Sequence, residues 1–252
     1  MITGNRVLDN YRKGKVSIGC QLRTRSSLIA EVYGLCGFDF VFIEGEHFPY
    51  NDESVLDIVT ACENRDIEPF FRLRGLDSSR IMQCLDIGVK GLLCPHIDSG
   101  ELAAQFVDAG KFQPLGQRGF SNTSRATDFG RIPMQEFKKL SNDHSMLVAF
   151  IESSQAVANI TQIIGAGVDG LHLGPGDLSE SYQCEMRDPV LQKAMDMVIE
   201  EAHRARIPVF APAANVQQAR DYIKRGIDVI SYSSDLALLR EAGSQAVQKI
   251  LE

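Results

Sequence analysis

The feature that most constrains the fold of this chain is a regular alternation of short apolar runs with longer amphipathic segments. Short runs rich in β-branched and aromatic residues are typical of buried strands, and helical periodicity marks the longer segments. Strands that alternate with helices imply parallel crossover units. The expected strands cover residues 15–22, 38–43, 68–73, 91–94, 146–151, 168–173, 207–210 and 227–232.

The segments between these strands carry helix start and stop signals, such as Ser or Asn caps and a following glycine. The expected helices cover residues 26–35, 51–63, 78–87, 99–108, 155–164, 190–204, 216–224 and 236–250. Eight strand–helix pairs in about 250 residues, without a break in composition, predict one α/β domain over residues 1–252, a (β/α)8 TIM barrel. A doubly wound open sheet is the alternative. It is less favoured because no Gly-rich fingerprint follows the first strand.

One excursion interrupts the alternation at about residues 111–140. Its first part reads KFQPLGQRGFSNTSRATDFGR and lacks apolar periodicity. A loop of this length inside a compact domain is usually functional or disordered. A short helix over residues 134–140 is expected within it.

Composition excludes several classes of protein. The net charge of −7 and the pI near 5.3 argue against a nucleic-acid partner, which needs a basic face. No apolar run approaches the roughly 20 residues that span a bilayer, and the N-terminus has no apolar signal core. The six dispersed cysteines form no CxxC pair and indicate free thiols in a reducing compartment. We therefore expect a cytoplasmic protein without a membrane partner.

Polar residues gather where the expected strands end. The C-terminal strand ends form the active face of such a barrel. Solvated turns, structural ion pairs and helix caps are alternative explanations for each residue taken alone. The strand-end residues are Glu44, Glu46 and His47, Arg72 and Arg74, His96 and Asp98, Glu152, and Asp177.

Two of these acids have the spacing of a metal site. Glu152 directly follows one strand and Asp177 lies 25 residues later, after the next strand. One strand–helix unit separates them, so both carboxylates are expected on adjacent strand ends. Two oxygen ligands with room for water suit Mg²⁺ or Mn²⁺ better than Zn²⁺. A helix N-terminal acid at Glu152 and a turn residue at Asp177 remain alternatives.

Six motifs occur in order and at fitting intervals along the chain. Together they resemble the HpcH/HpaI family of class II, metal-dependent pyruvate aldolases, from about Gly37 to Ser179 and more weakly beyond. Six ordered motifs are far more specific than any one of them. They read GFDFVFIEGEHFPYND, FFRLRG, GVKGLLCPHID, PLGQRGFSNTSRATDFG, FIESSQAVANI and GVDGLHLGPGDLS.

The resemblance implies roles for individual residues. Glu152 and Asp177 would bind a divalent metal, Mg²⁺ or Mn²⁺, with Co²⁺ as a further candidate. The backbone of Gly174, Pro175, Gly176 and Asp177 would hold the substrate carboxylate. Arg72 would bind substrate and stabilise the enolate oxygen. His47 would be the general base, oriented by the acid at Glu44, which is usually aspartate in this family.

The resemblance also implies a reaction and an assembly. The enzyme would cleave or form a 4-hydroxy-2-keto acid through a metal-bound pyruvate enolate, with small-molecule 2-keto acid and aldehyde substrates. A metal and an arginine offset the negative charge of an enolate, and histidine exchanges protons near neutral pH. The C-terminal helix is expected to be swapped between subunits of a homo-oligomer, a hexamer built as a trimer of dimers.

Departures from the family pattern keep other reactions open. Glu44 replaces aspartate, Phe150 stands where a glutamine is expected, and residues 211–214 depart from an aliphatic pattern. A second hypothesis is therefore a citrate-synthase-like condensation of oxaloacetate with an acyl-CoA, or another metal–enolate reaction. A third is a barrel that only binds keto acids or scaffolds an assembly. The complete set of His47, Arg72, Glu152 and Asp177 counts against this third hypothesis.

Overall fold

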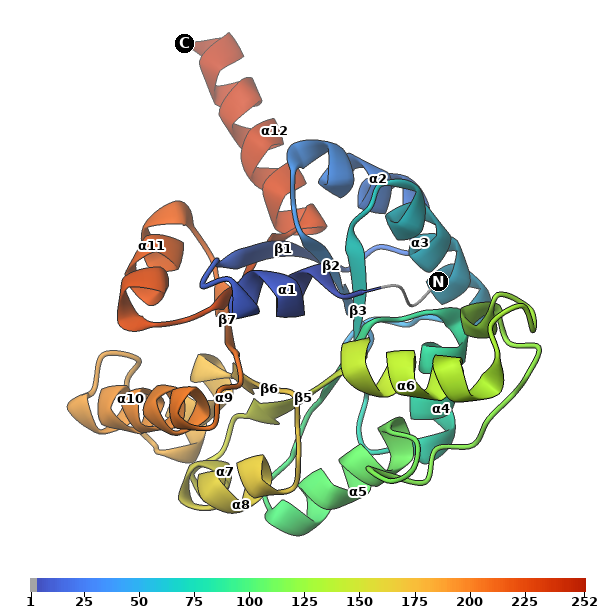
Figure 1. Ribbon diagram of the computed structural model, residues 1–252. Helices are drawn as coiled ribbons and strands as arrows, with labels where there is room; N and C mark the ends of the chain where they lie inside the picture. The colour runs from blue at the N-terminus through green and yellow to red at the C-terminus, as the bar shows by residue number, and fades with distance from the viewer. Residues whose placement is uncertain (1–3) are drawn as a thin grey trace.

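The computed structural model describes residues 4–252 and shows a closed barrel of eight parallel strands, ordered β1 to β8 (Figure 1). The predicted (β/α)8 TIM barrel is therefore confirmed. Each strand pairs in parallel with the next one in the chain, and β8 pairs with β1. The strands are β1 (Ser17–Leu22), β2 (Phe40–Glu44), β3 (Glu68–Arg72), β4 (Gly91–Cys94), β5 (Met146–Ile151), β6 (Gly170–Leu173), β7 (Val209–Ala213) and β8 (Val229–Ser234).

Large rings fill the barrel interior, and glycines on neighbouring strands make room for them. Phe40, Phe70 and Phe210 are fully buried and contact one another, with ring centroids 5.3 to 6.4 Å apart. A Cβ on Gly19 would lie 2.5 Å from the Phe40 ring, and one on Gly91 would lie 2.1 Å from the Phe70 ring. Such distances are too short for a side chain, so glycine is needed at both positions.

Eight helices begin and end close to the predicted positions. Asn51, Asp77, Ser99 and Asn215 cap their helices through side-chain hydrogen bonds to backbone N–H groups. Gly37, Gly88 and Gly226 end helices in the left-handed conformation. These helices are α2 (Ser27–Cys36), α3 (Asp52–Asn64), α4 (Ser78–Ile87), α5 (Gly100–Gly110), α6 (Met134–His144), α10 (Pro189–Arg204), α11 (Val216–Arg225) and α12 (Asp235–Leu251).

The other helices differ from the prediction. The single helix expected over residues 155–164 is split into α7 (Ser154–Ala158) and α8 (Ile160–Gly165) at Asn159, whose side chain donates to the Asp98 carbonyl at 2.8 Å. Two helices were not predicted, α1 (Arg6–Arg12) and α9 (Pro175–Ser181). Helix α1 crosses the N-terminal end of the barrel (Figure 1), where Val7 is buried against the interior rings.

The long excursion after α5 is folded onto the outside of the barrel. It contains a 3-10 turn, η1 (Arg125–Thr127), and the helix α6. Arg118 pairs with Asp86 at 2.5 Å, and Arg125 pairs with Glu63 at 2.5 Å. Phe112, Ala126 and Phe137 form a small separate core beneath it. These contacts place both arginines in structural ion pairs within this chain.

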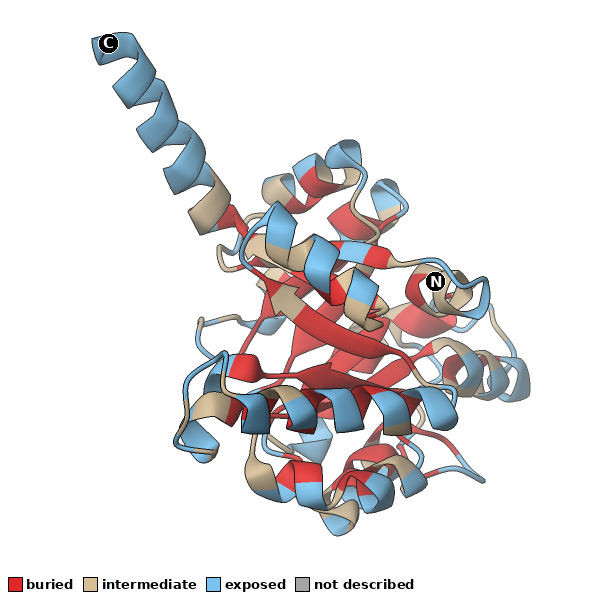
Figure 2. Ribbon diagram, turned by 90° about the vertical axis from the view of Figure 1, so that its left-hand side faces the viewer, coloured by how far each residue is buried: buried red, intermediate tan, exposed pale blue. Residues whose placement is uncertain are grey.

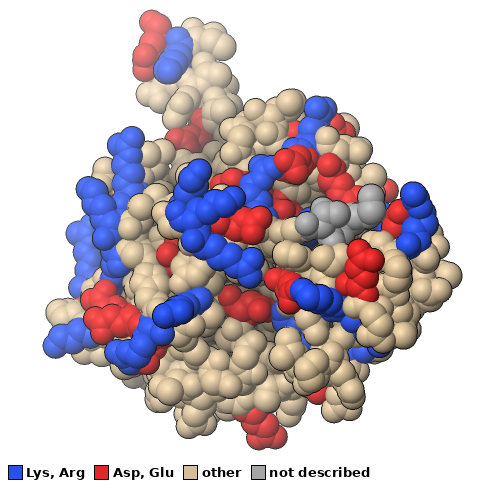
Figure 3. All heavy atoms as spheres, in the orientation of Figure 1, with Lys and Arg blue, Asp and Glu red and all other residues tan. Residues whose placement is uncertain are grey.

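Helix α12 leaves the barrel and projects from it, with most of its length exposed (Figures 1 and 2). Asp235, at its start, is its only buried residue, whereas Leu239 and Ile250 are strongly exposed. On the face in Figure 3, acidic and basic side chains are mixed, with basic ones gathered along the edge formed by α11. Within residues 4–252, no helix is both long enough and apolar enough to cross a membrane.

Candidate active site

The turn after β2 is built around the buried carboxylate of Glu44. Its Oε1 accepts hydrogen bonds from the backbone N–H groups of Glu46 and His47, at 3.0 and 3.4 Å. Gly45 permits this tight turn, because a Cβ there would lie 2.5 Å from the carbonyl oxygen of Arg72. The Glu44 carboxylate therefore fixes the backbone on which Glu46 and His47 are mounted.

Arg72 lies at the end of β3 and connects the acids of the rim. Its Nη1 donates to Glu44 Oε2 at 3.1 Å, and its Nη2 forms an ion pair with Glu46. The same Nη2 lies 3.6 Å from Glu152 Oε2. The guanidinium carbon stands 4.3 Å from the centroid of the Phe150 ring, a cation–π contact. The buried guanidinium of Arg72 thus lies close to three carboxylates, and the Phe150 ring packs against it.

Glu152 follows β5 and is 6% exposed. Its Oε1 accepts the backbone N–H of His96 at 2.8 Å, and the His96 ring Nδ1 lies 3.2 Å from the same oxygen. Burial raises the pKa of the Glu152 carboxyl, while the His96 N–H and Arg72 oppose that shift. A cation placed beside the carboxylate would further stabilise its ionised form.

Two exposed imidazoles flank Glu46. The His47 Nε2 lies 3.6 Å from one Glu46 oxygen, and the His96 Nε2 lies 3.5 Å from the other. The side chain of His47 is 67% exposed, so its ring is accessible from the barrel mouth. Glu44 holds the backbone of His47, while Glu46 is the acid closest to its ring.

The predicted metal ligands come from neighbouring strand ends. Gly174, which precedes α9, packs directly on Glu152: a Cβ there would lie 2.8 Å from the Glu152 Cβ and 3.5 Å from its Oε2. Asp177 lies in the first turn of α9 and is exposed, and its carboxylate forms no hydrogen bond or ion pair with another residue between 4 and 252. Both carboxylates therefore retain oxygens for a cation.

This donor set fits a hard divalent ion. The described residues 4–252 contain no group of three or more His, Cys, Asp or Glu side chains arranged to hold a metal. A site with two carboxylates does not need a third, because Mg²⁺ and Mn²⁺ complete their octahedra with water and substrate oxygens. The glycine contact leaves space beside Glu152 Oε2 that any side chain at position 174 would fill.

Other residues of the rim have structural partners. Arg74 donates to the Gly45 carbonyl at 3.3 Å. Asp98 accepts from the Ser153 hydroxyl. His172 is buried in the barrel and stacks on Phe150 with centroids 4.1 Å apart, and neither of its ring nitrogens has a hydrogen-bond partner among residues 4–252. Burial lowers the pKa of His172 to about 3, so this ring is neutral at physiological pH.

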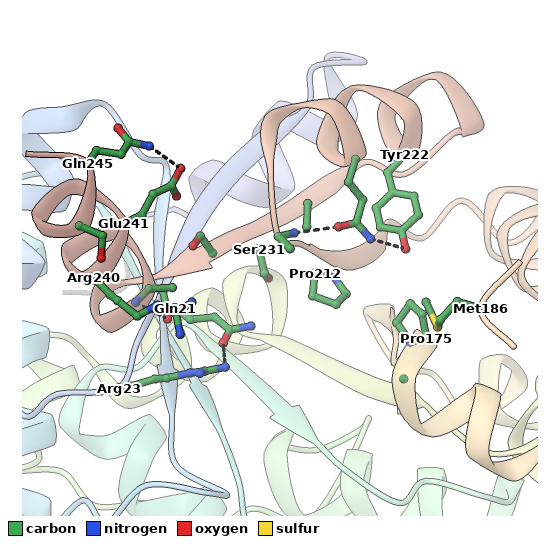
Figure 4. Close-up of a pocket in the computed structure, with 18 of the residues that line it drawn as sticks. Gln21, Arg23, Pro175, Met186, Pro212, Tyr222, Ser231, Arg240, Glu241 and Gln245 are labelled. Carbon is green, nitrogen blue, oxygen red and sulfur yellow. Dashed lines mark hydrogen bonds between the residues drawn. The ribbon is translucent and has the colours of Figure 1, made fainter. Parts of the chain in front are cut away.

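A cavity of about 700 Å³ occupies the other half of the mouth, between β7, β8, β1 and the start of α12 (Figure 4). Pro175 and Gly176 border it, whereas Arg72 and Glu152 do not. Sequence reasoning missed Arg23 and Ser231 in its wall. The same rule that found Glu152 would have found Arg23, since it directly follows Leu22, the last residue of β1.

Comparisons with known proteins define the class to which this barrel and its strand-end site belong. The model of the HpcH/HpaI aldolase/citrate lyase family matches residues 18–242. A 4-hydroxy-2-oxo-heptane-1,7-dioate aldolase from Shigella sonnei (strain Ss046) is 32% identical over 235 residues, covering 92% of this chain and 89% of the relative. A 5-keto-4-deoxy-D-glucarate aldolase from Enterobacter sp. (strain 638) is 31% identical, covering 90% of each chain.

A solved structure agrees with these matches. The crystal structure of an HpcH/HpaI aldolase/citrate lyase family protein from Burkholderia cenocepacia J2315 superposes with a TM-score of 0.91 at 27% identity. The alignment covers 98% of this chain and 100% of that one. The protein is therefore a barrel enzyme of the carbon–carbon lyase class. It belongs to the HpcH/HpaI aldolase/citrate lyase family and is an aldolase of that family.

Proposed function

We propose that the protein is a metal-dependent aldolase that cleaves or forms a 4-hydroxy-2-keto acid, with pyruvate as the fragment common to its substrates. The observation that carries this proposal is the placement of Arg72 at the C-terminal rim of the barrel. Its guanidinium forms ion pairs with Glu44 and Glu46 and lies 3.6 Å from Glu152. The two aldolases compared above, which are among the relatives of this chain, are both named for oxo acids.

Glu152 and Asp177 would hold a divalent metal, Mg²⁺ or Mn²⁺ in the first place and Co²⁺ as a further candidate. When bound, such an ion polarises a substrate carbonyl and lowers the pKa of the neighbouring C–H bond. In the segment 174–177, the N–H groups of Gly176 and Asp177 would bind the carboxylate of the keto acid, since Pro175 has no N–H and the Gly174 N–H donates to the Ile151 carbonyl at 3.1 Å.

Arg72 would stabilise the negative charge that develops on the enolate oxygen. Its guanidinium is already oriented by Glu44, Glu46 and the Phe150 ring, so little reorganisation is needed as charge builds up. Its Nε is buried and has no hydrogen-bond partner among residues 4–252. Arg72 thus acts through fixed electrostatics.

His47 would move the proton between the pyruvate methyl group and the solvent side of the mouth. An imidazole can both accept and return a proton, which is what this transfer needs. Glu44 would position it by binding its backbone N–H, and Glu46 would stabilise its protonated form from 3.6 Å. Glu44 would thus orient the base through its backbone, whereas Glu46 would act on its ring.

Proton exchange tests the proposal without an acceptor substrate. Pyruvate incubated in D₂O with the protein and Mg²⁺ or Mn²⁺ should lose its methyl proton signals in the NMR spectrum, and EDTA should stop the loss. Absence of exchange with every metal would contradict the proposal. Thiol release from an acyl-CoA in the presence of oxaloacetate would instead support the condensation reaction.

We further propose that the enzyme works as a homo-oligomer in the cytoplasm, without nucleic-acid or membrane partners. The projecting α12 exposes Leu239, Val247, Ile250 and Leu251, a surface suited to packing on a neighbouring subunit of a hexamer. All six cysteines are free, which fits a reducing compartment. Light scattering of the full chain, and of a variant with Leu239→Asp and Ile250→Asp, tests the assembly. A monomeric parent would contradict it.

A further inference from the structure

The cavity beside α12 adjoins the proposed reaction site through α9. Gly174 packs on Glu152, and the next two residues, Pro175 and Gly176, line the cavity. At about 700 Å³, the cavity is larger than a three-carbon keto acid requires. A second reactant can therefore occupy it while the first is bound beside Glu152.

Arg23 is a cation without an anion in the wall of this cavity (Figure 4). Its Nη2 donates to the neutral Gln21 side chain at 3.1 Å, and its Nε is buried without a hydrogen-bond partner. Within residues 4–252 it forms no ion pair, and its guanidinium lies 5.6 Å from the Phe48 ring centroid. An unpaired buried donor of this kind carries a desolvation penalty that a bound anion would relieve.

The backbone that carries Arg23 is held in place by α12. Asp235, at the first position of that helix, accepts hydrogen bonds from the N–H groups of Arg23 and Thr24 at 3.0 and 2.9 Å, and from the Thr24 hydroxyl at 2.6 Å. These bonds occupy the Asp235 carboxylate with the backbone and leave the guanidinium for a ligand. The arginine is thus pre-positioned on a fixed segment.

Ser231 adds a second unused polar group to the same wall. It lies on β8, next to β1, and is 1% exposed, yet its hydroxyl has no hydrogen-bond partner. The lining residues carry two arginines, Arg23 and Arg240, and one acid, Glu241. Buried polar groups are normally satisfied, so a hydroxyl without a hydrogen-bond partner and an arginine without an ion pair in one cavity indicate a polar ligand.

We propose that this cavity binds the acceptor substrate and that Arg23, assisted by Ser231, selects acceptors with an anionic group remote from the reacting carbonyl. This inference rests on the proposed aldolase function and specifies its second substrate. The anion is a carboxylate or a phosphate, both of which match the planar fork of arginine. Glu44, Glu46 and Glu152 on the opposite half repel that anion, so the charges orient the substrate.

The test compares three aldehydes of equal chain length that end in a carboxylate, a phosphate or a hydroxyl. We expect kcat/KM for one of the charged aldehydes to exceed that for the hydroxyl aldehyde by at least about tenfold, since one charge-assisted contact contributes this much. Whichever anion is preferred identifies the chemistry of the acceptor. Equal kcat/KM for all three would overturn the proposal.

Substitutions assign the preference to residues. Arg23→Gln should reduce the charged-to-neutral ratio to near one, Arg23→Lys should retain part of it because the charge remains, and Ser231→Ala should lower it by a few fold. Arg220→Gln, which removes the same charge from an exposed site on α11, is the matched control and should keep the full ratio. A ratio unchanged by Arg23→Gln would contradict the role of Arg23.

Failure of this inference is distinguishable from failure of the aldolase proposal. Deuterium exchange of the pyruvate methyl group needs no acceptor, so it reports on the half of the site around Glu152 alone. Loss of exchange in the parent protein contradicts the aldolase proposal. Exchange with no preference for a charged acceptor contradicts the anion subsite and leaves the aldolase proposal standing.

Discussion

The two halves of the barrel mouth differ in charge and in how completely their polar groups are paired. Around β2, β3 and β5, three glutamates surround Arg72, and each carboxylate contacts a cation or a backbone N–H. Around β7, β8 and β1, Arg23 and Ser231 border an open cavity with unused donors. A densely paired cluster is preorganised for charge stabilisation, whereas unpaired groups in a cavity are suited to recognition.

The largest expected effect is on turnover and follows from Glu152→Gln, a substitution in the acidic half of the mouth, around β2, β3 and β5. The substitution keeps the shape and the hydrogen bond to the His96 N–H but removes the charge that a cation needs. We expect turnover to fall by on the order of 10³-fold or more, because metal polarisation contributes several kcal/mol. Calorimetric titration with Mn²⁺ should show weakened binding. Metal affinity equal to that of the parent would show that Glu152 is not a ligand.

The next largest effect is on the rate of pyruvate exchange, and it shows which of the two imidazoles beside Glu46 is the general base. His47→Ala should slow pyruvate exchange by about 10² to 10⁴-fold, the usual contribution of a general base, while Mn²⁺ affinity is retained. His96→Ala is the comparison, because its ring lies at a similar distance from Glu46. Slower exchange in His96→Ala than in His47→Ala would transfer the role of base to His96.

A smaller effect tests how α9 joins the two halves. In Gly174→Ala, the new methyl group would lie 2.8 Å from the Glu152 Cβ, so one of the two segments must shift. We expect Mn²⁺ affinity to fall by about tenfold, the range seen when groups that orient metal ligands are changed. Gly165→Ala, where no atom lies within 4 Å, is the control. Equal affinities in both variants would separate the position of Glu152 from metal binding.

The smallest expected effect is on the pH dependence of stability and concerns the buried imidazole of His172, which stacks on Phe150. The pKa of His172 is lowered from 6.5 to about 3 by burial, so between these values the unfolded chain binds a proton that the folded chain does not. Stability should therefore fall as the pH drops below 6.5, by about 2 kcal/mol at pH 5 from this residue. Urea denaturation at pH 7 and pH 5 should show a smaller decrease for His172→Leu. Identical decreases would show that His172 does not control this pH dependence.

The acidic half was largely predictable from the sequence and the cavity half was not. Apolar runs that end in Glu44, Arg72 and Glu152 mark strand ends directly, and a closed parallel barrel brings such ends to one rim. The contacts of Glu46 could not be predicted, because they depend on the tight turn at Gly45. Arg23 follows the end of β1 directly, so its position was predictable, but its place in a cavity wall depends on β8 and α12, which are distant in the sequence.

Helices α1 and α9 were not predicted from the sequence, and in both cases there is a physical explanation. Gly174-Pro175-Gly176 reads as a turn, yet proline is favoured at the first position of a helix, where α9 places it. Helix α1 has 7 residues, too few for a stable isolated helix, and is held by the Asn5 cap and by Val7 in the barrel. In both cases tertiary contacts decide the structure.

Proton exchange is the most direct test of the central claim that the acidic half performs the chemistry on the keto acid. Pyruvate in D₂O, with the parent protein and Mn²⁺, should lose its methyl proton signals, and both EDTA and Glu152→Gln should suppress that loss. The claim is contradicted if the signals persist with the parent and every divalent metal tried, or if Glu152→Gln exchanges as fast as the parent.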